Sequence, residues 1–146
     1  MATENMSSEA LSRAPKRGKK YFSLSEANRA LPYVARVVED ITSCYRTAVQ
    51  LRQHIEHPMP EDCAEKLQSD YDRSMDKLSN LMEELHQVGV ELKDFEMGLL
   101  DFPAVHDGRE VYLCWHRGET NVQAWHEIDS GYAGRQDIAS FKPASN

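Results

Sequence analysis

The sequence predicts an α+β fold, in which a long antiparallel helical hairpin packs on a small C-terminal antiparallel sheet of three or four strands. Apolar residues recur every three or four positions through residues 24–88, which is the period of an amphipathic helix. A proline-rich break at 57–60 divides this run into two helices. After Gly89 the pattern changes to apolar–polar alternation around an Asp-Gly dipeptide, which is typical of a β-hairpin.

The chain has 146 residues, of which 40% are hydrophobic and 28% are charged, as in a single globular domain. We expect a disordered basic arm at 1–20, one α+β domain at 21–141 and a tail at 142–146. Within the domain, the helical hairpin spans 24–88, and the sheet with a Gly-rich exit loop spans 90–138.

The net charge is −7, and the excess acid lies in the body of the chain rather than in the arm. An acidic body repels phosphate backbones, so we expect no nucleic-acid binding through it. No stretch is apolar enough to cross a bilayer, and the N-terminus lacks the apolar segment of a secretory signal. The three cysteines form no CxxC pair. These features predict reduced thiols, a cytoplasmic location and no membrane contact.

The first helix is expected to begin at a capping box, because Ser23 and Glu26 have the S-x-x-E spacing. Pro32 lies inside the apolar run that follows, where it removes an amide donor and crowds the preceding turn. We therefore expect a short helical turn at 24–30, a kink, and a long helix at 32–56.

The second helix is expected to start at Pro60, which suits the first helical position, and to end at Gly89 in a left-handed cap. A short connection makes the two helices antiparallel neighbours. Two helices alone leave half of each apolar seam exposed to water. The sheet, a second copy of the hairpin, or both could cover the seams, and a symmetric dimer would close a four-helix bundle.

The turn Asp107-Gly108 predicts the register of the first β-hairpin. On one face it pairs Ala104 with Val111, Phe102 with Leu113 and Leu100 with Trp115. On the other face it pairs Val105 with Glu110, Pro103 with Tyr112 and Asp101 with Cys114. A second turn at 117–120 is expected to set Trp115 against Val122, Leu113 against Ala124 and Val111 against His126. Residues 90–93 are a candidate edge strand.

This register has consequences for metal binding. His126 falls on the apolar face, whereas Cys114 falls on the opposite face. Cys114, His116 and His126 are ligand types for transition metals, but in this register they do not meet. We therefore expect no metal site from them and no cofactor.

Two carboxylates, Glu110 and Glu127, are expected directly opposite each other. Like charges there are destabilising unless a cation or a proton intervenes. They form either a metal or acid–base pair, or carboxylates that turn to solvent or share Arg135 or Lys93 as a counter-ion. The second interpretation is favoured.

The candidate acid–base groups are His126 and Asp101, although a lone histidine on an apolar face is more often a core residue. Cys114 as a nucleophile would need a base, and its expected neighbour Asp101 is an anion, which disfavours a thiolate. The chain has no GxSxG motif. The sequence thus favours a protein that is not an enzyme.

The Gly-rich exit loop at 129–135 ends in Arg135, which together with Arg109 is the candidate anion-binding pair. The competing interpretation is that Arg135 clamps a buried acid such as Asp101. A separate candidate is a protein interface on the polar sheet face, where aromatic and small side chains are flanked by acids. Its expected members are Pro103, Tyr112, Cys114 and Trp125.

Three blocks of sequence carry a family resemblance: YFSLSEANRALP, GVELKDFEMGLLDFPAVHDGREVYLCWHRGE and WHEIDSGYAGRQDI. Over about residues 20–138, the chain resembles the uncharacterised prokaryotic family known as domain of unknown function 2203. The resemblance implies a single α+β unit in a bacterial cytoplasm, with no established activity, substrate or ligand. The motif positions it singles out are Asp101, Arg109, Cys114, Trp115, Trp125, His126 and Arg135.

Taken together, these observations predict a non-enzymatic protein-binding or scaffolding module that acts as a homodimer. The alternative is an anion-binding protein or enzyme, in which Arg135 and Arg109 hold the anion and His126 or Asp101 is the acid–base group. The alternative requires these groups to converge.

Overall fold

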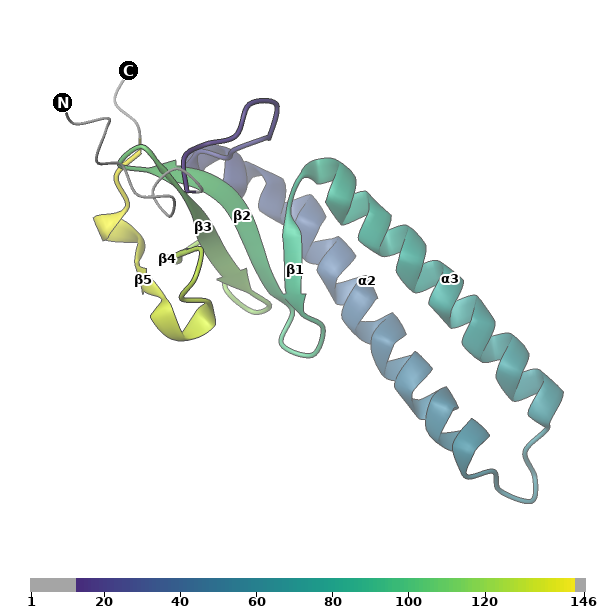
Figure 1. Ribbon diagram of the computed structural model, residues 1–146. Coiled ribbons are helices and arrows are strands. Elements are labelled where there is room, and N and C mark those ends of the chain that lie inside the picture. The colour runs from purple at the N-terminus through teal and green to yellow at the C-terminus, as the bar shows by residue number, and fades with distance from the viewer. Residues whose placement is uncertain (1–12, 144–146) are drawn as a thin grey trace.

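The computed structural model describes residues 13–143 and has the α+β architecture expected from the sequence (Figure 1). The predicted arm and tail lie partly outside the described residues, at 1–12 and 144–146. Two long helices form an antiparallel hairpin, and a twisted sheet packs on one end of it. No described helix has a stretch long and apolar enough to cross a membrane.

Helix α2 (Leu24–Glu56) begins at the predicted capping box. The Glu26 amide donates to Ser23 Oγ at 3.0 Å, and the Ser23 amide donates to Glu26 Oε1 at 2.9 Å. The expected separation into a short turn and a long helix is wrong, because α2 runs through Pro32 without interruption. Pro32 lies on the solvent side of α2, so its ring does not disturb the packing of the buried face of the helix.

Helix α3 (Ala64–Val88) starts four residues later than predicted, after Cys63. The carboxylate of Asp62 accepts a hydrogen bond from the Met59 amide at 2.8 Å. The Asp62 amide in turn donates to the Met59 carbonyl at 2.9 Å. These bonds hold Pro60 in a turn rather than in the first turn of the helix.

The end of α3 agrees with the sequence prediction. Gly89 has a φ of 96°, in the left-handed region, and its amide donates to the carbonyls of Leu85 and His86. The Val90 amide also donates to the Leu85 carbonyl, at 3.3 Å. This C-cap turns the chain directly from α3 into the sheet.

The sheet has five antiparallel strands, one more than the larger number expected, and its order follows the chain. The strands are β1 (Glu91–Asp94), β2 (Leu99–His106), β3 (Arg109–His116), β4 (Ala124–Glu127) and β5 (Gln136–Asp137). The predicted edge strand is β1. The additional strand β5 lies at the end of the expected exit loop, where two residues pair with β4.

The register of the first β-hairpin is confirmed at all six predicted pairs between β2 and β3. Its turn residues Asp107 and Gly108 have φ values of 49° and 78°. A two-residue hairpin turn requires positive φ at these positions, and Asp-Gly adopts it readily. Local turn chemistry therefore determines this register.

The predicted register of the second β-hairpin is wrong by one residue. β4 is paired so that Leu113 faces Trp125 and Tyr112 faces His126. The connection from β3 to β4 is not a tight turn but spans residues 117–123, so turn geometry does not determine the register. A one-residue shift exchanges the two faces of a strand, so Trp125 and His126 lie on the faces opposite to those expected.

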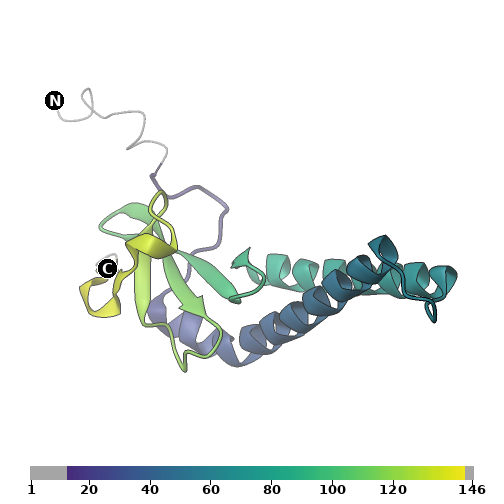
Figure 2. The same cartoon turned by 90° about the horizontal axis from the view of Figure 1, so that it is seen from below.

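The hydrophobic core lies between the N-terminal half of α2 and one face of the sheet. The distal part of the helical hairpin projects well beyond the sheet, as both views show (Figures 1 and 2). Large members of the core are Val34, Ile41, Phe102, Leu113, Trp115 and Trp125.

Candidate functional site

Three side chains that can act as acid–base groups or metal ligands meet on the sheet face that turns away from α2. Asp101, Cys114 and His126 come from the neighbouring strands β2, β3 and β4. Their ligand atoms all lie within 4.8 Å of one another. The prediction that Cys114 and His126 face opposite sides is wrong, because it followed from the incorrect register of β4. We call these three residues the Asp–Cys–His cluster.

The cluster is closed to solvent. The exposed fractions are 2% for Asp101, 0% for Cys114 and 2% for His126. Buried polar groups are stable only when they are hydrogen-bonded or paired. The arrangement inside the cluster therefore decides what these side chains do.

Both ring nitrogens of His126 have partners. Nδ1 lies 2.8 Å from the Glu127 carbonyl, and Nε2 lies 3.0 Å from Asp101 Oδ1. A carbonyl oxygen can only accept, so Nδ1 carries a hydrogen and Nε2 faces the cluster. Burial alone would lower the pKa of His126. The hydrogen bonds to Asp101, Cys114 and the Glu127 carbonyl raise the pKa by more than burial lowers it, and the result is a pKa of about 10. The ring is therefore an imidazolium paired with a carboxylate when no other cation is present.

Tyr112 borders the cluster, with its ring centroid 5.5 Å from that of His126. Its hydroxyl donates to Glu91 Oε2 at 3.1 Å, and Lys93 Nζ lies 4.9 Å from the ring centroid. Burial and the Glu91 carboxylate raise the pKa of Tyr112, so the hydroxyl stays protonated at neutral pH.

The chain before α2 crosses the same face. The carbonyl of Arg13 accepts from the Glu110 amide on β3, and the Phe22 amide donates to the Pro103 carbonyl on β2 at 2.7 Å. Between these points, the ammonium of Lys19 pairs with the Glu110 carboxylate. Residues 13–20, assigned to the disordered arm by the sequence prediction, thus lie against the sheet.

Glu110 and Glu127 do not form the predicted pair. The register shift places Glu127 opposite Val111. Glu110, which is 2% exposed, pairs with Lys19. Glu127 instead accepts from Arg109, with Nε at 2.8 Å from Oε1. Each carboxylate therefore has its own cation.

Arg135 clamps an internal acid, but that acid is Glu119 rather than Asp101. Its Nη2 lies 2.9 and 3.0 Å from the two carboxylate oxygens of Glu119, and 3.4 Å from the Cys114 carbonyl. Arg109 is engaged by Glu127 in a separate ion pair. The two arginines do not converge with His126 on a common site.

The predicted protein interface is not on the surface. Pro103, Tyr112 and Cys114 are buried on the polar face, and Trp125 is only 3% exposed on the core face. The Trp125 ring stacks on His106 at 4.2 Å, and its Nε1 donates to Ser140 Oγ at 2.9 Å. The exposed-interface interpretation of these four residues is therefore wrong.

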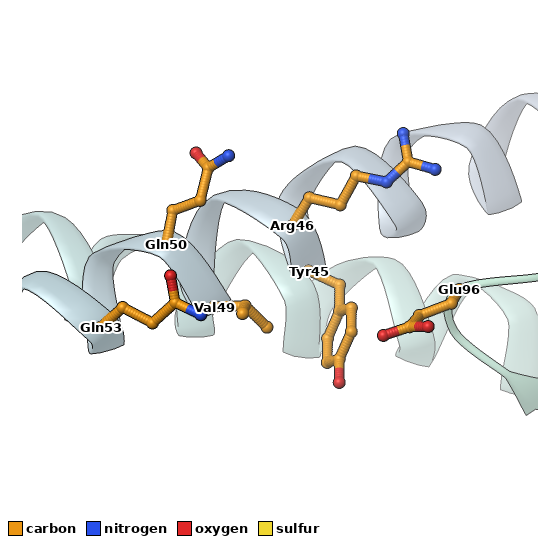
Figure 3. Close-up of a pocket in the computed structure, with 6 residues that line it drawn as sticks. All are labelled: Tyr45, Arg46, Val49, Gln50, Gln53 and Glu96. Atoms are coloured by element: carbon orange, nitrogen blue, oxygen red, sulfur yellow. The ribbon is translucent and has the colours of Figure 1, made fainter.

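The helical hairpin offers a different surface. From residue 49 to residue 77, which includes both helix ends and their connection, no side chain of this described stretch is buried. We call residues 49–77 the hairpin tip. A shallow hollow of about 280 Å³ lies where the tip begins, lined by Tyr45, Arg46, Val49, Gln50, Gln53 and Glu96 (Figure 3). In this view Tyr45 and Val49 point to the same side, and Glu96 approaches from the β1–β2 connection.

Sequence reasoning missed two partners that shape the site. Lys19 reaches Glu110 across 91 residues, and Glu119 reaches Arg135 across 16. No local pattern signals either contact. The members of the Asp–Cys–His cluster were recognised as separate candidates, but their convergence depended on the register of β4.

Comparison with known families agrees with this fold and gives no activity. The family model described as "Uncharacterized conserved protein (DUF2203)" matches residues 20–138, so the chain belongs to this family. No curated protein and no solved structure matches the chain.

Proposed function

We propose that this protein is a non-enzymatic cytoplasmic scaffolding module that forms a homodimer through the hairpin tip. The observation that supports the proposal is the lack of any buried side chain in residues 49–77, beside a tightly packed sheet end. Three unpaired cysteines, Cys44, Cys63 and Cys114, are compatible with a reducing compartment.

The tip has an apolar seam that its own two helices cover only in part. Leu51 and Ile55 on α2, and Leu67 and Tyr71 on α3, are all half-buried. In proteins, helical stability comes mostly from packing of the apolar face rather than from helix propensity. A second hairpin packed against this seam would complete the burial, as in a four-helix bundle.

The tip carries charges of both signs, with four Lys/Arg and seven Asp/Glu. Some are paired within one helix, as Arg52 with Glu56 and Lys66 with Asp70. A surface with both signs can pair with a second copy of itself about a two-fold axis when basic groups of one copy meet acids of the other.

The alternative function, anion binding or catalysis by Arg135, Arg109 and His126 or Asp101, has less support. It needs these groups to converge on a ligand. Arg109 is held by Glu127, Arg135 by Glu119 and His126 by Asp101, each in a separate pair. A ligand would have to displace an internal carboxylate.

The first test is the mass of the full chain in solution by light scattering after gel filtration. The proposal expects twice the chain mass of 16.7 kDa. Hydrogen exchange then locates the contact: amides of 49–77 should lose protection on dilution through the dissociation constant, while amides of the α2 core should not. A monomer at high micromolar concentration would refute the proposal.

A matched pair of variants tests the surface. Met75, on α3 within the tip, is 40% exposed, and Met97, in the β1–β2 connection, is 43% exposed. Met75→Arg should weaken the dimer at least tenfold, because it places a desolvated charge beside the seam. Met97→Arg should leave the dimer unchanged. Equal effects of the two substitutions would mean that the tip is not the interface.

A further inference from the structure

We propose that the Asp–Cys–His cluster is a binding site for a divalent transition-metal ion, with Zn²⁺ as the best fit. The proposal concerns the sheet end of the molecule and does not depend on self-association through the hairpin tip.

The donor set is the first argument. A carboxylate oxygen, a thiol sulfur and an imidazole nitrogen are the three side-chain ligands that Zn²⁺ uses in proteins. Here they come from three adjacent strands, and their ligand atoms lie within 4.8 Å of one another. Zinc bonds of about 2.0–2.3 Å in a tetrahedron place ligand atoms about 3.3–3.7 Å apart. Small side-chain rotations would bring Asp101, Cys114 and His126 to that spacing.

The orientation of His126 is a second and independent argument. Metal-binding histidines usually donate the hydrogen of their other ring nitrogen to a carbonyl or carboxylate, which fixes the tautomer. His126 Nδ1 donates to the Glu127 carbonyl at 2.8 Å. Nε2, which lies 3.0 Å from Asp101 Oδ1, is therefore the ring nitrogen that could bind an ion after it loses its proton.

Charge balance is the third argument. A Zn²⁺ ion held by the neutral ring of His126, the carboxylate of Asp101 and a thiolate of Cys114 faces two negative ligands. The occupied site would therefore carry no net charge, which avoids an uncompensated charge away from water.

The donor types also predict selectivity. A thiolate and an imidazole are soft or intermediate ligands that favour Zn²⁺ over Mg²⁺ and Ca²⁺, which prefer oxygen. We therefore expect binding of zinc and cobalt, and no comparable binding of magnesium.

The test uses the full chain, stripped with a chelator and titrated with Co²⁺ and Zn²⁺. Cobalt should give a thiolate-to-metal charge-transfer band with a stoichiometry of one, and one equivalent of zinc should abolish it. Zinc should raise the melting temperature, whereas magnesium at the same concentration should not. Absence of the band, or equal shifts with zinc and magnesium, would overturn the proposal.

Cysteine variants identify the ligand. Cys114→Ser should lose the cobalt band, whereas Cys63→Ala, at the exposed cysteine, and Cys44→Ala, at the other buried cysteine, should keep it. A band that survives in Cys114→Ser and disappears in Cys63→Ala would assign the metal to the helix connection and refute the site. If Cys114→Ser fails to fold, the double variant Cys44→Ala with Cys63→Ala decides the question, because Cys114 is then the only cysteine. This variant should give the same cobalt band as the wild type, and loss of the band would refute the site.

Discussion

Breaking the buried pair between Asp101 and His126 should strongly destabilise the metal-free protein. Asp101 Oδ1 and His126 Nε2 are 3.0 Å apart, and each side chain is 2% exposed. Asp101→Asn keeps the shape of the side chain but removes its charge. Removal of one partner from a buried ion pair typically costs about 3–5 kcal/mol, because the other charge is left without compensation. We expect a loss of that size at neutral pH.

The same ion pair should make the free energy of unfolding depend on pH. The pKa of His126 is raised in the folded protein from 6.5 to about 10. The stability that the pair contributes is therefore fully present at pH values below the pKa of His126 in the unfolded chain. It is lost as the pH rises towards the pKa of His126 in the folded protein. Between these limits, the wild-type free energy of unfolding should fall by up to about 1.4 kcal/mol per pH unit. Asp101→Asn should flatten this part of the curve.

The assay is urea unfolding followed by circular dichroism, with a chelator present, at half-unit steps from pH 6 to pH 10. Asp76→Asn, on the exposed side of α3, is the matched control; it should stay within about 0.5 kcal/mol of wild type and keep the wild-type slope. A loss below about 1 kcal/mol for Asp101→Asn, or a wild-type curve without the fall, would refute the argument.

Three further predictions concern packing around the sheet, all measured by urea unfolding. Trp125→Ala should cost about 3–5 kcal/mol, because the ring is buried in the core; a cost below 1 would place it on the surface. Gly98→Ala should cost at least about 1 kcal/mol, since φ is +67° and a Cβ would lie 3.1 Å from Val38 Cγ1; no loss would show that this turn relaxes. Lys19→Met should destabilise by about 1–3 kcal/mol by leaving Glu110 without its cation; adding Glu110→Gln should recover part of the loss, and no recovery would mean that the pair is not coupled.

The sequence predicted what local chemistry determines. The helices, the C-cap at Gly89 and the hairpin at Asp107-Gly108 all depend on residues that are near one another in the chain. The register of β4 could not be predicted, because a seven-residue connection does not restrict it and either Trp125 or His126 could face the core. The fold class does not depend on this register, but the site does, so the fold class was predicted correctly and the site was not.

The failure at the site has a physical cause as well. Alternation of apolar and polar residues indicates which face is buried only when the other face meets water. Here residues 13–22 lie across the polar face, and the β3–β4 and exit loops contribute Glu119 and Arg135. Both faces are then buried, and the polar one is satisfied by long-range ion pairs. A polar face in sequence was therefore not an exposed face in the structure.

Stability alone does not account for an acid, a thiol and an imidazole at the centre of that buried face. Replacement of a buried ion pair by apolar residues of similar volume is often neutral or stabilising, by about 1–4 kcal/mol. The double substitution Asp101→Val with His126→Val should therefore restore most of the stability lost in Asp101→Asn. The Glu127 carbonyl would still accept from the Ser130 amide. The same double variant should lose all response to zinc in melting temperature and in the cobalt spectrum. If this double variant is as stable as the wild type and still binds zinc, the cluster has only a structural role. If it is stable and does not bind zinc, these residues are ligands of the ion.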